Sequence, residues 1–350
     1  MKKILFTGGG SAGHVIPNIA LIEELLSQGK TDLCYMGTEG IEKEIVTARG
    51  IPYYTITCPK LVRGKSFSAV KNNLRIPLSF QRAVKEAERG LQVFRPDLVF
   101  SKGGYVALPV VFAARKLKIP CIAHESDFSL GLANRLSAKK CKTVLTSFPE
   151  TAERVKNGKY GGAPIRRSIL SAKRESAREA LGIAKNEKVL LVFGGGSGSK
   201  ALNGALRSRL KTLTEKYCIL HVCGKGNAVK NTFQNYRQFE FVADMGMLYA
   251  AADLVLSRAG AGTVFELLAL KKPSLLVPLS GATRGDQKQN AEYFRLKGLC
   301  RVLPQERLDI LEEALEAAFS DKELKRKLLE SNYAQGNSRI LGEIHALLYE

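Results

Sequence analysis

The chain has 350 residues, of which 45% are hydrophobic and 7% aromatic, and its formal net charge is +21. This length predicts two domains of ordinary size, and no apolar stretch approaches the roughly 20 residues of a membrane span, which argues against a transmembrane protein. The strong positive charge indicates an anionic partner: a nucleic acid, an acidic membrane surface or a phosphorylated substrate.

The first half of the chain alternates short apolar strands with helices. Strands are predicted at 3–6, 32–36, 97–100 and 120–123, and helices at 17–28, 42–49 and 109–117. Pro17 and Gly29 mark the ends of the first helix, because proline favours a helix start and glycine a helix end. This alternation predicts a parallel sheet with helices on both faces.

The pattern restarts after the glycine-rich segment 157–167, which we interpret as a linker. Strands are predicted at 188–193, 217–223, 253–256 and 274–277, a helix follows the glycine loop through residue 210, and 321–349 is predicted helical. The duplication predicts an α/β protein with Rossmann-like domains at 1–163 and 164–330, and residues 331–350 packing back on the first. Such sheets bind ligands beyond the carboxyl ends of their strands, so a deep cleft between the domains would suit two substrates.

The first glycine loop, residues 8–14, follows the first strand. Its backbone N–H groups at a helix start could form a phosphate cradle, although a tight turn without a ligand is the alternative. Gly8, Gly10 and Gly13 match the dinucleotide pattern, but no acid ends the second strand at Met36, which argues against NAD. His14 is a candidate general base, or else a hydrogen-bonded structural histidine.

Two further strand ends of the first half carry polar groups. Residues 101–105 supply a lysine and two glycines, which suits a second phosphate-facing loop or an ordinary turn. Glu125 ends the strand that begins near residue 120 and is a second base candidate. The sequence does not decide between Glu125 and His14.

The second half carries three polar loops. Ser199 replaces the last glycine of the dinucleotide pattern in the loop 194–199, but its N–H groups and the Ser197 hydroxyl suit a pyrophosphate. Glu266 lies one turn inside the next helix, where it could bind ribose hydroxyls or simply favour the helix dipole. The amide-rich loop 284–290 suits sugar hydroxyls, or is a solvated loop.

The sequence holds no metal-binding pattern: no Asp-x-Asp, no histidine pair at helical spacing and no cysteine cluster among seven cysteines. We therefore expect reduced cysteines, no metal and no cofactor. Arg166 and the loop around Ser197 are expected to stabilise a leaving nucleoside diphosphate.

The segment 60–89 combines many basic residues with apolar ones. This composition suits an anionic membrane surface, and the alternative is a domain helix whose apolar side lies in the core. The residues of this candidate membrane patch are Leu74, Arg75, Leu78, Phe80 and Arg82.

Motifs in collinear order over nearly the whole chain resemble the MurG family, the undecaprenyl-diphospho-muramoylpentapeptide N-acetylglucosaminyltransferases of peptidoglycan synthesis. The motifs lie at 9–17, 101–106, 124–125, 131–134, 162–166, 195–199, 258–266, 287 and 290–291. Ala12 departs from the family's usual glycine. The resemblance implies a GT-B fold, an inverting mechanism and a peripheral location on the cytoplasmic face of the plasma membrane.

The resemblance also implies how the donor, UDP-N-acetylglucosamine, is bound. Arg166 and Ser197 would contact the diphosphate, and Glu266 the ribose. The backbone of Val242 would contact the uracil. The full implied donor set is Ser11, Ala12, Gly13, Arg166, Gly196, Ser197, Gly198, Val242, Glu266, Gln287 and Asn290.

For the acceptor, the resemblance implies lipid I, whose muramoyl C4 hydroxyl would attack the anomeric carbon as UDP leaves. Its diphosphate would meet Gly9, Gly10, Gly13, Gly103 and Gly104, and the implied catalytic residues are His14, Glu125 and Asn134. One alternative is a related enzyme with another lipid acceptor, such as a diacylglycerol. A nucleic-acid-binding protein is a weaker alternative, because it rests on charge alone and leaves the glycine loops unexplained.

Overall fold

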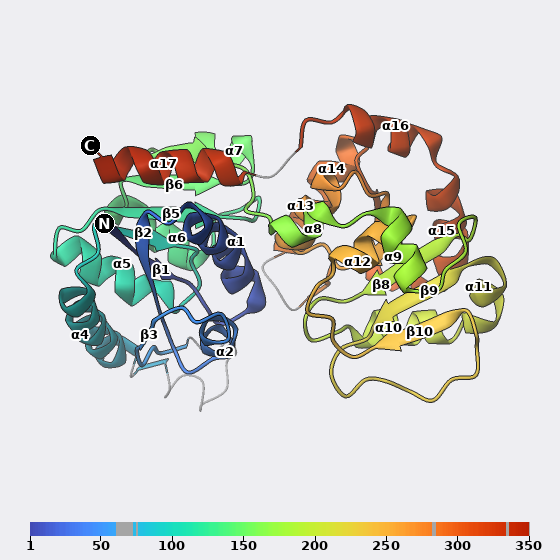
Figure 1. The fold of residues 1–350 in the computed structure, drawn as a ribbon, viewed down its shortest axis with the longest axis horizontal. Helices are drawn as coiled ribbons and strands as arrows, with labels where there is room; N and C mark the ends of the chain where they lie inside the picture. Colours follow the sequence, from blue (N-terminus) through green and yellow to red (C-terminus); the bar gives the residue numbers. More distant parts are fainter. Residues whose placement is uncertain (61–72, 75, 282–284, 334–335, 350) are drawn as a thin grey trace. The chain divides into compact units, whose positions relative to one another are not determined.

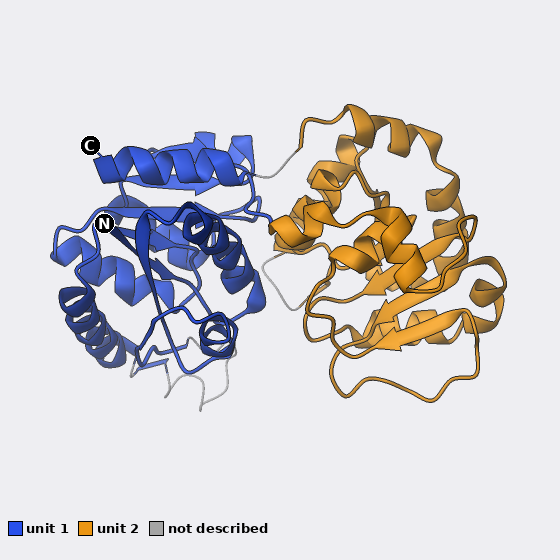
Figure 2. Cartoon of the chain, viewed as in Figure 1, with its two compact units in different colours: residues 1–165, 336–350 blue, residues 166–335 orange. Residues whose placement is uncertain are grey.

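A computed structural model of the chain describes residues 1–60, 73–74, 76–281, 285–333 and 336–349. The chain forms two compact units, which are coloured separately in Figure 2. The first comprises Met1–Ile165 with Gly336–Glu350, and the second comprises Arg166–Gln335. None of the helices in the described ranges is long and apolar enough to cross a bilayer.

The first unit is built on a parallel sheet that has seven strands among the described residues (Figure 1). These are β1 (Lys2–Thr7), β2 (Thr31–Gly37), β3 (Tyr53–Thr55), β4 (Leu98–Ser101), β5 (Cys121–Glu125), β6 (Thr143–Thr146) and β7 (Gly158–Tyr160). Their order is β3-β2-β1-β4-β5-β6-β7, and all neighbouring pairs are parallel. The order therefore reverses between β1 and β4.

Hydrophobic cores cover both faces of this sheet, because successive strand residues point to opposite faces. Ile4 and Phe6 pack in one core, and Leu5 packs in the other. The helices are α1 (Ala12–Gln28), α2 (Ile41–Thr47), α4 (Ile76–Phe94), α5 (Ala107–Lys116), α6 (Leu132–Ser137), α7 (Pro149–Glu153) and α17 (Asn337–Tyr349). Helices α1 and α17 contribute to the first core, and α4 and α5 to the second.

Helix α17 joins the first unit although the described residues 166–333, which precede it in the chain, belong to the second. Ile340 and Ile344 are fully buried in the core that contains β1. Asn337 ties the start of the helix to the end of the unit's main segment: its Oδ1 accepts from Ile165 N at 2.9 Å, and its Nδ2 donates to Ile165 O at 3.0 Å. The chain thus returns to its first sheet at its end.

The second unit holds a parallel sheet of six strands within its described residues. These are β8 (Val189–Phe193), β9 (Cys218–Val222), β10 (Tyr236–Phe239), β11 (Leu254–Ser257), β12 (Ser274–Leu276) and β13 (Arg301–Val302). Their order, β10-β9-β8-β11-β12-β13, reverses between β8 and β11. The two sheets confirm the predicted fold class of two α/β domains with parallel sheets.

Helices of the second unit precede its first strand, fill most of the connections between its strands and follow its last strand. They are α8 (Arg167–Ser171), α9 (Arg174–Ala180), α10 (Lys200–Arg207), α11 (Leu210–Lys216), α12 (Gly246–Ala251), α13 (Ala261–Ala269), α14 (Asp286–Leu296), α15 (Leu311–Ser320) and α16 (Lys322–Glu330). Helices α10, α11 and α15 cover one core of the sheet.

Several boundaries differ from the sequence prediction. Helix α1 begins at Ala12 rather than at Pro17, because the extended Ser11 ends the loop, and Pro17 lies inside the helix. The predicted linker 157–167 contains the edge strand β7. The predicted helix 321–349 is two helices, α16 and α17, in different units.

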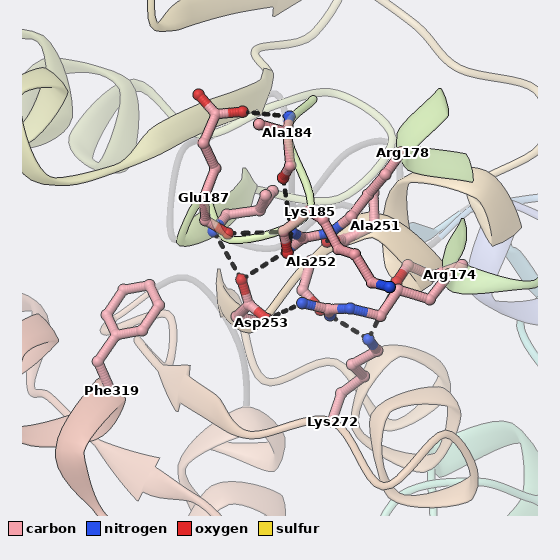
Figure 3. A network of polar contacts seen from close by, with 12 residues as sticks. Arg174, Arg178, Ala184, Lys185, Glu187, Ala251, Ala252, Asp253, Lys272 and Phe319 are labelled. Atoms are coloured by element: carbon pink, nitrogen blue, oxygen red, sulfur yellow. Dashed lines mark hydrogen bonds and ion pairs between the residues drawn. The ribbon is translucent and has the colours of Figure 1, made fainter. Parts of the chain in front are cut away.

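A polar network joins the amino ends of two strands in the second unit (Figure 3). Asp253 accepts hydrogen bonds from Arg174 at 2.6 Å, Arg178 at 2.8 Å and Val189 N at 2.8 Å. Arg178 also donates to carbonyl oxygens of the turn 184–187. Ligands of such sheets bind beyond the opposite, carboxyl ends of the strands, so this network stabilises the fold rather than a substrate.

Candidate active site

The candidate site residues lie beyond the carboxyl ends of the strands. In the first unit, the reversal of strand order brings together the loops after β1 and β4, residues 8–11 and 102–106. In the second unit it brings together the loops after β8 and β11, residues 194–199 and 258–260. The two groups belong to different units.

A buried carboxylate that the sequence analysis did not single out holds the first glycine loop. Glu42 of α2 is fully buried, and its Oε2 accepts a hydrogen bond from Gly10 N at 3.1 Å. Its Oε1 accepts from the backbone N of Thr38 at 3.1 Å and from the Thr38 hydroxyl at 2.5 Å. One N–H group of the expected phosphate cradle therefore already has a partner, and that partner is negatively charged.

His14 lies in the first turn of α1, with its ring beside the loop after β4. Its Nδ1 lies 2.9 Å from Ser11 Oγ, and a side chain on Gly104 would begin 3.3 Å from the same nitrogen. Burial and the charge of Lys102 lower the pKa of His14 from 6.5 to about 4, and Glu42 opposes this shift. The imidazole is therefore neutral at pH 7.

Lys102 is buried in the loop after β4. Its side chain reaches Ser126, where Nζ donates to Oγ at 2.6 Å. Burial lowers the pKa of Lys102 to about 8, and the charges of Glu125 and Asp127 oppose that shift. The side chain is therefore largely an ammonium ion at neutral pH.

Glu125, the second base candidate, is buried at the end of β5. Its Oε1 accepts from Asp127 N at 3.0 Å, and its Oε2 accepts from Gly131 N at 2.7 Å and Asn134 Nδ2 at 2.9 Å. Both oxygens are occupied by protein donors, which indicates that Glu125 fixes the loop 126–131. This geometry favours His14 as the base.

Asn134, in α6, is also buried. Its Nδ2 donates to His124 O at 3.1 Å as well as to Glu125. Its Oδ1 accepts no hydrogen bond from the described residues and lies against Gly103, where an added Cβ would come within 2.8 Å. Asn134 thus links β5 to the loop after β4.

The glycines expected at the acceptor diphosphate come together in the first unit. A side chain on Gly104 would begin only 2.6 Å from Gly9 O, so the two loops are in direct contact. Three residues that the resemblance assigns to the donor, Ser11, Ala12 and Gly13, lie at the amino end of α1 in the same unit.

The glycine loop of the second unit is open toward solvent. Gly195, Gly196 and Ser197 are exposed, and a side chain on either glycine would meet no atom within 4 Å. Gly198, in contrast, has a φ of +75° and packs against Cys223 O, so only glycine fits there. The middle of this loop is therefore free to approach a ligand.

Ser199 caps helix α10, which explains why a serine stands where the dinucleotide pattern has glycine. Its hydroxyl accepts from Leu202 N at 3.4 Å and from Arg258 Nη2 at 2.9 Å. Arg258 is buried, and it also donates to Val277 O at 3.1 Å and Gln305 Oε1 at 2.6 Å. Arg258 therefore joins three loops of this unit.

Arg166 and Glu266 lie together in the second unit, with their nearest charged atoms 3.8 Å apart. Tyr249, fully buried in α12, donates to Glu266 Oε2 at 2.9 Å. Burial raises the pKa of Glu266, and the charge of Arg166 opposes this shift. Arg166 Nε is buried without a hydrogen-bond partner among the described residues, so this guanidinium retains a free donor.

The remaining residues that are expected to bind the sugar donor differ in how exposed they are. Val242 is partly exposed in the loop between β10 and α12. The Oε1 of Gln287 accepts from Leu279 N at 2.9 Å. Asn290 is fully buried, and its Nδ2 lies 3.4 Å from Ala259 O, so it braces the loop after β11.

The candidate membrane patch is partly exposed. Leu74 and Leu78 have 75% and 68% of their surface exposed. Phe80 is only partly exposed, because its ring packs edge-on against Phe112 of α5 with 5.2 Å between centroids. Arg75 lies outside the described residues.

No group of three or more His, Cys, Asp or Glu side chains in the described ranges could hold a metal ion. The sequence alone does not mark Glu42 or Tyr249 as site residues, because each is one polar residue without a motif around it. A glutamate in the first turn of a helix or a tyrosine in an apolar helix is common, and only the fold shows their partners.

Comparisons with known proteins agree over both units. The glycosyltransferase family 28 N-terminal domain matches residues 4–146, and the family 28 C-terminal domain matches residues 189–340. A UDP-N-acetylglucosamine–N-acetylmuramyl-(pentapeptide) pyrophosphoryl-undecaprenol N-acetylglucosamine transferase of Clostridium perfringens is 44% identical over 333 residues, 93% of this chain and 91% of the relative. A protein of the same name from Clostridium botulinum is 43% identical over 335 residues, 94% of this chain and 90% of the relative.

Solved structures show the same fold. The crystal structure of Acinetobacter baumannii MurG matches with a TM-score of 0.75 and 28% identity, over 99% of this chain and all of the other. A Neisseria meningitidis UDP-GlcNAc 2-epimerase bound to UDP-GlcNAc matches with a TM-score of 0.68, but at 16% identity it shows the fold alone.

Proposed function

The chain belongs to glycosyltransferase family 28 and, within it, to the MurG family, and from this membership we propose that it converts lipid I to lipid II. It transfers N-acetylglucosamine from UDP-N-acetylglucosamine to the muramoyl C4 hydroxyl of undecaprenyl-diphospho-muramoylpentapeptide. The observation that carries the proposal is the 44% identity to a named N-acetylglucosamine transferase over 93% of this chain.

The second unit binds the donor in this proposal. The exposed loop at Gly196 and Ser197 presents N–H groups to the diphosphate, and the guanidinium of Arg166 adds a positive charge. Glu266, oriented by Tyr249, accepts hydrogen bonds from the ribose hydroxyls. The backbone of Val242 contacts the uracil, and Gln287 contacts the sugar.

The first unit binds the lipid I diphosphate at the loops around Gly9 and Gly104 and supplies the base. With its proton on Nδ1, His14 donates to Ser11 Oγ and leaves Nε2 free to accept the proton of the C4 hydroxyl. The C4 oxygen then forms a bond to the anomeric carbon with inversion, as the bond from that carbon to the UDP oxygen breaks. UDP leaves with the electron pair.

The test is transfer of labelled N-acetylglucosamine to a lipid I analogue without added metal, with diacylglycerol as a parallel acceptor. We expect the disaccharide product and free UDP in equal amounts, and no product with diacylglycerol. A Glu266→Ala variant should raise the KM for the donor. Glycosylation of diacylglycerol without any disaccharide would show that the acceptor assignment is wrong.

We further propose that the protein works on an anionic membrane surface at the cytoplasmic face of the plasma membrane. Leu74 is exposed just before α4, and Leu78, Arg82 and Lys85 are exposed on that helix. Apolar side chains flanked by cations suit insertion between anionic headgroups. Phe80 is a poor probe of this surface because it packs against Phe112.

Cosedimentation with anionic vesicles tests the membrane proposal. The double change Leu74→Ser with Leu78→Ser should weaken binding at least about thirtyfold, since each leucine loses roughly 1 kcal/mol or more of burial in lipid. Leu329→Ser is the matched control, because Leu329 is 73% exposed on α16 of the other unit. Equal vesicle binding by both variants would contradict the proposal.

A further inference from the structure

Lys102 is a buried cation that the proposed reaction has not used. It is 2% exposed, and few lysines are buried to this degree without a specific partner. Lys102 also lies near the candidate base, because Gly8 packs between the two residues. A Cβ added to Gly8 would be 3.0 Å from Lys102 Cβ and 3.0 Å from His14 O. Two residues later, Gly104 packs against the His14 ring.

The backbone and side chain of Lys102 join three parts of the site. Its N–H donates to Thr7 O at the end of β1, at 2.8 Å. Its Nζ donates to Ser126 Oγ at 2.6 Å, in the loop whose other end is held by Glu125. The side chain thus runs from the glycine loops to the loop that follows β5.

The charges around this lysine come from several elements. Glu125 and Asp127 face Lys102 from β5 and its loop and favour its charged form. The charge of Lys102 lowers the pKa of His14 on α1, and the charge of Glu42 on α2 raises it. His124 on β5 is a second neutral imidazole near this cation.

We propose that Lys102 is a positioning residue of the candidate active site, whose buried ammonium ion fixes the loop 126–131 through Ser126 and acts electrostatically on the His14 imidazole. A cation next to an imidazole disfavours a proton on the ring. Lys102 therefore keeps His14 able to accept a proton, while Glu42 limits how far its basicity falls. The inference rests on the proposed function only in giving His14 the role of base.

The direct test is a histidine NMR titration of the full chain, which has four histidines. His14→Asn identifies the His14 signal. In Lys102→Met the His14 midpoint should rise by on the order of one pH unit, at the lower end of the shifts that a nearby charge causes. Lys102→Arg, which keeps the charge, should restore the midpoint close to its original value.

Lys272→Met is the matched control. Lys272 is a second lysine whose pKa burial lowers to about 8, but it lies in the other unit, where its Nζ donates to Ala252 O at 2.6 Å. The Lys272→Met variant should leave the midpoint of the His14 titration unchanged. A His14 midpoint that does not move in Lys102→Met, or that moves equally in Lys272→Met, overturns the inference.

A measurement on the unaltered protein covers the case in which Lys102→Met does not fold. The His14 signal should show a second, smaller inflection near the pKa of Lys102, about 8, as the ammonium loses its proton. That inflection should be absent in Lys102→Arg, whose guanidinium stays charged. A His14 signal that is flat through this range in the unaltered protein overturns the electrostatic coupling.

Transfer kinetics give an independent readout. In Lys102→Met the acidic limb of the pH profile of kcat/KM should shift upward with the His14 midpoint, while the KM for UDP-N-acetylglucosamine is unchanged. A purely structural role would lower kcat without moving that limb. If the protein transfers no N-acetylglucosamine, the proposed function fails, and the NMR titration still decides the coupling between Lys102 and His14.

Discussion

Tyr249 shows how one buried side chain orients another that is expected to meet the donor. Its hydroxyl donates to Glu266 Oε2 at 2.9 Å, and its ring packs against Phe193 at the end of β8. The loop that follows Phe193 is the open glycine loop. The same tyrosine therefore contacts the carboxylate expected at the ribose and the strand that leads to the diphosphate loop.

Replacing Tyr249 by Phe keeps this packing and removes one hydrogen bond to a buried carboxylate. We expect the KM for the donor to rise about tenfold, because such a bond contributes roughly 1.5 kcal/mol and Glu266 would lose its fixed orientation. Steady-state kinetics at saturating acceptor measures the change.

Tyr236→Phe is the control for that substitution. Tyr236 is also buried in the second unit, and its hydroxyl is 2.7 Å from His221 Nδ1, away from Glu266. The Tyr236→Phe variant should be less stable than the unaltered protein, and its KM for the donor should be unchanged. Equal KM effects for the two variants would mean that Tyr249 acts only through the stability of the unit.

At the residue level, the sequence indicated which side chains could act as a base, but it did not indicate their hydrogen-bond partners. A histidine after a glycine loop and a glutamate at a strand end both predicted a base, and only the fold shows that Glu125 is occupied by three donors while His14 is not. Glu42 could not be foreseen, because its contact with Gly10 joins residues 32 positions apart. The site roles themselves stay predictions until the variants are measured.

Single elements were predictable where their ends carry strong local signals. The strands that precede the glycine loops, β1 and β8, were predicted within one residue, because an uninterrupted apolar run stops at a glycine. The edge strands β3, β7, β10 and β13 were not predicted. They are short and partly exposed, so they lack the apolar run that marks a buried strand.

Helix α10 links an element's stability to the candidate donor site. Ser199→Ala removes the cap hydroxyl and one partner of Arg258. The free energy of unfolding should fall by about 1 kcal/mol, and the donor KM should rise because the loop 194–199 ends at this cap. Urea unfolding and donor kinetics measure the two effects.

Asp321→Ala is the matched control for that cap. Asp321 caps α16 in the same unit, where its Oδ1 accepts from Leu324 N at 2.9 Å, and it is not part of a glycine loop. Its loss should lower stability by a comparable amount and leave the donor KM unchanged. If the donor KM rose as much in Asp321→Ala, the cap at Ser199 would have no specific link to the donor.

For the whole molecule, the two sheets followed from the alternation of strands and helices, whereas the expectation that residues 331–350 pack back on the first domain had no local sequence signal behind it. Helix α17 contributes Ile340 and Ile344 to the first core, although α16 just before it belongs to the second unit. An amphipathic helix fits any open apolar face, so its sequence does not say which sheet it covers.

The two units should respond differently to acid, because the histidines whose pKa is lowered in the folded state are distributed unequally between them. Burial lowers the pKa of His14 to about 4 and that of His124 well below 6.5 in the first unit, and that of His221 to about 4 in the second. The unfolded chain binds protons on these residues as the pH falls through 6.5 and the folded chain does not, so stability is lost between 6.5 and about 4. Glu266 acts oppositely, since a raised pKa in the folded state stabilises the second unit as the pH falls.

We therefore expect the first unit to lose more stability than the second when the pH falls from about 7.5 to about 5.5, because each histidine whose pKa is lowered in the folded state contributes a loss of roughly 1 kcal/mol over that range. Hydrogen exchange measured peptide by peptide, corrected for the intrinsic effect of pH, reports the opening of each unit separately. His14→Gln should reduce the acid sensitivity of the first unit and leave that of the second unaltered. A second unit that opens first on acidification would contradict the prediction, because it would mean that groups other than these histidines control the response.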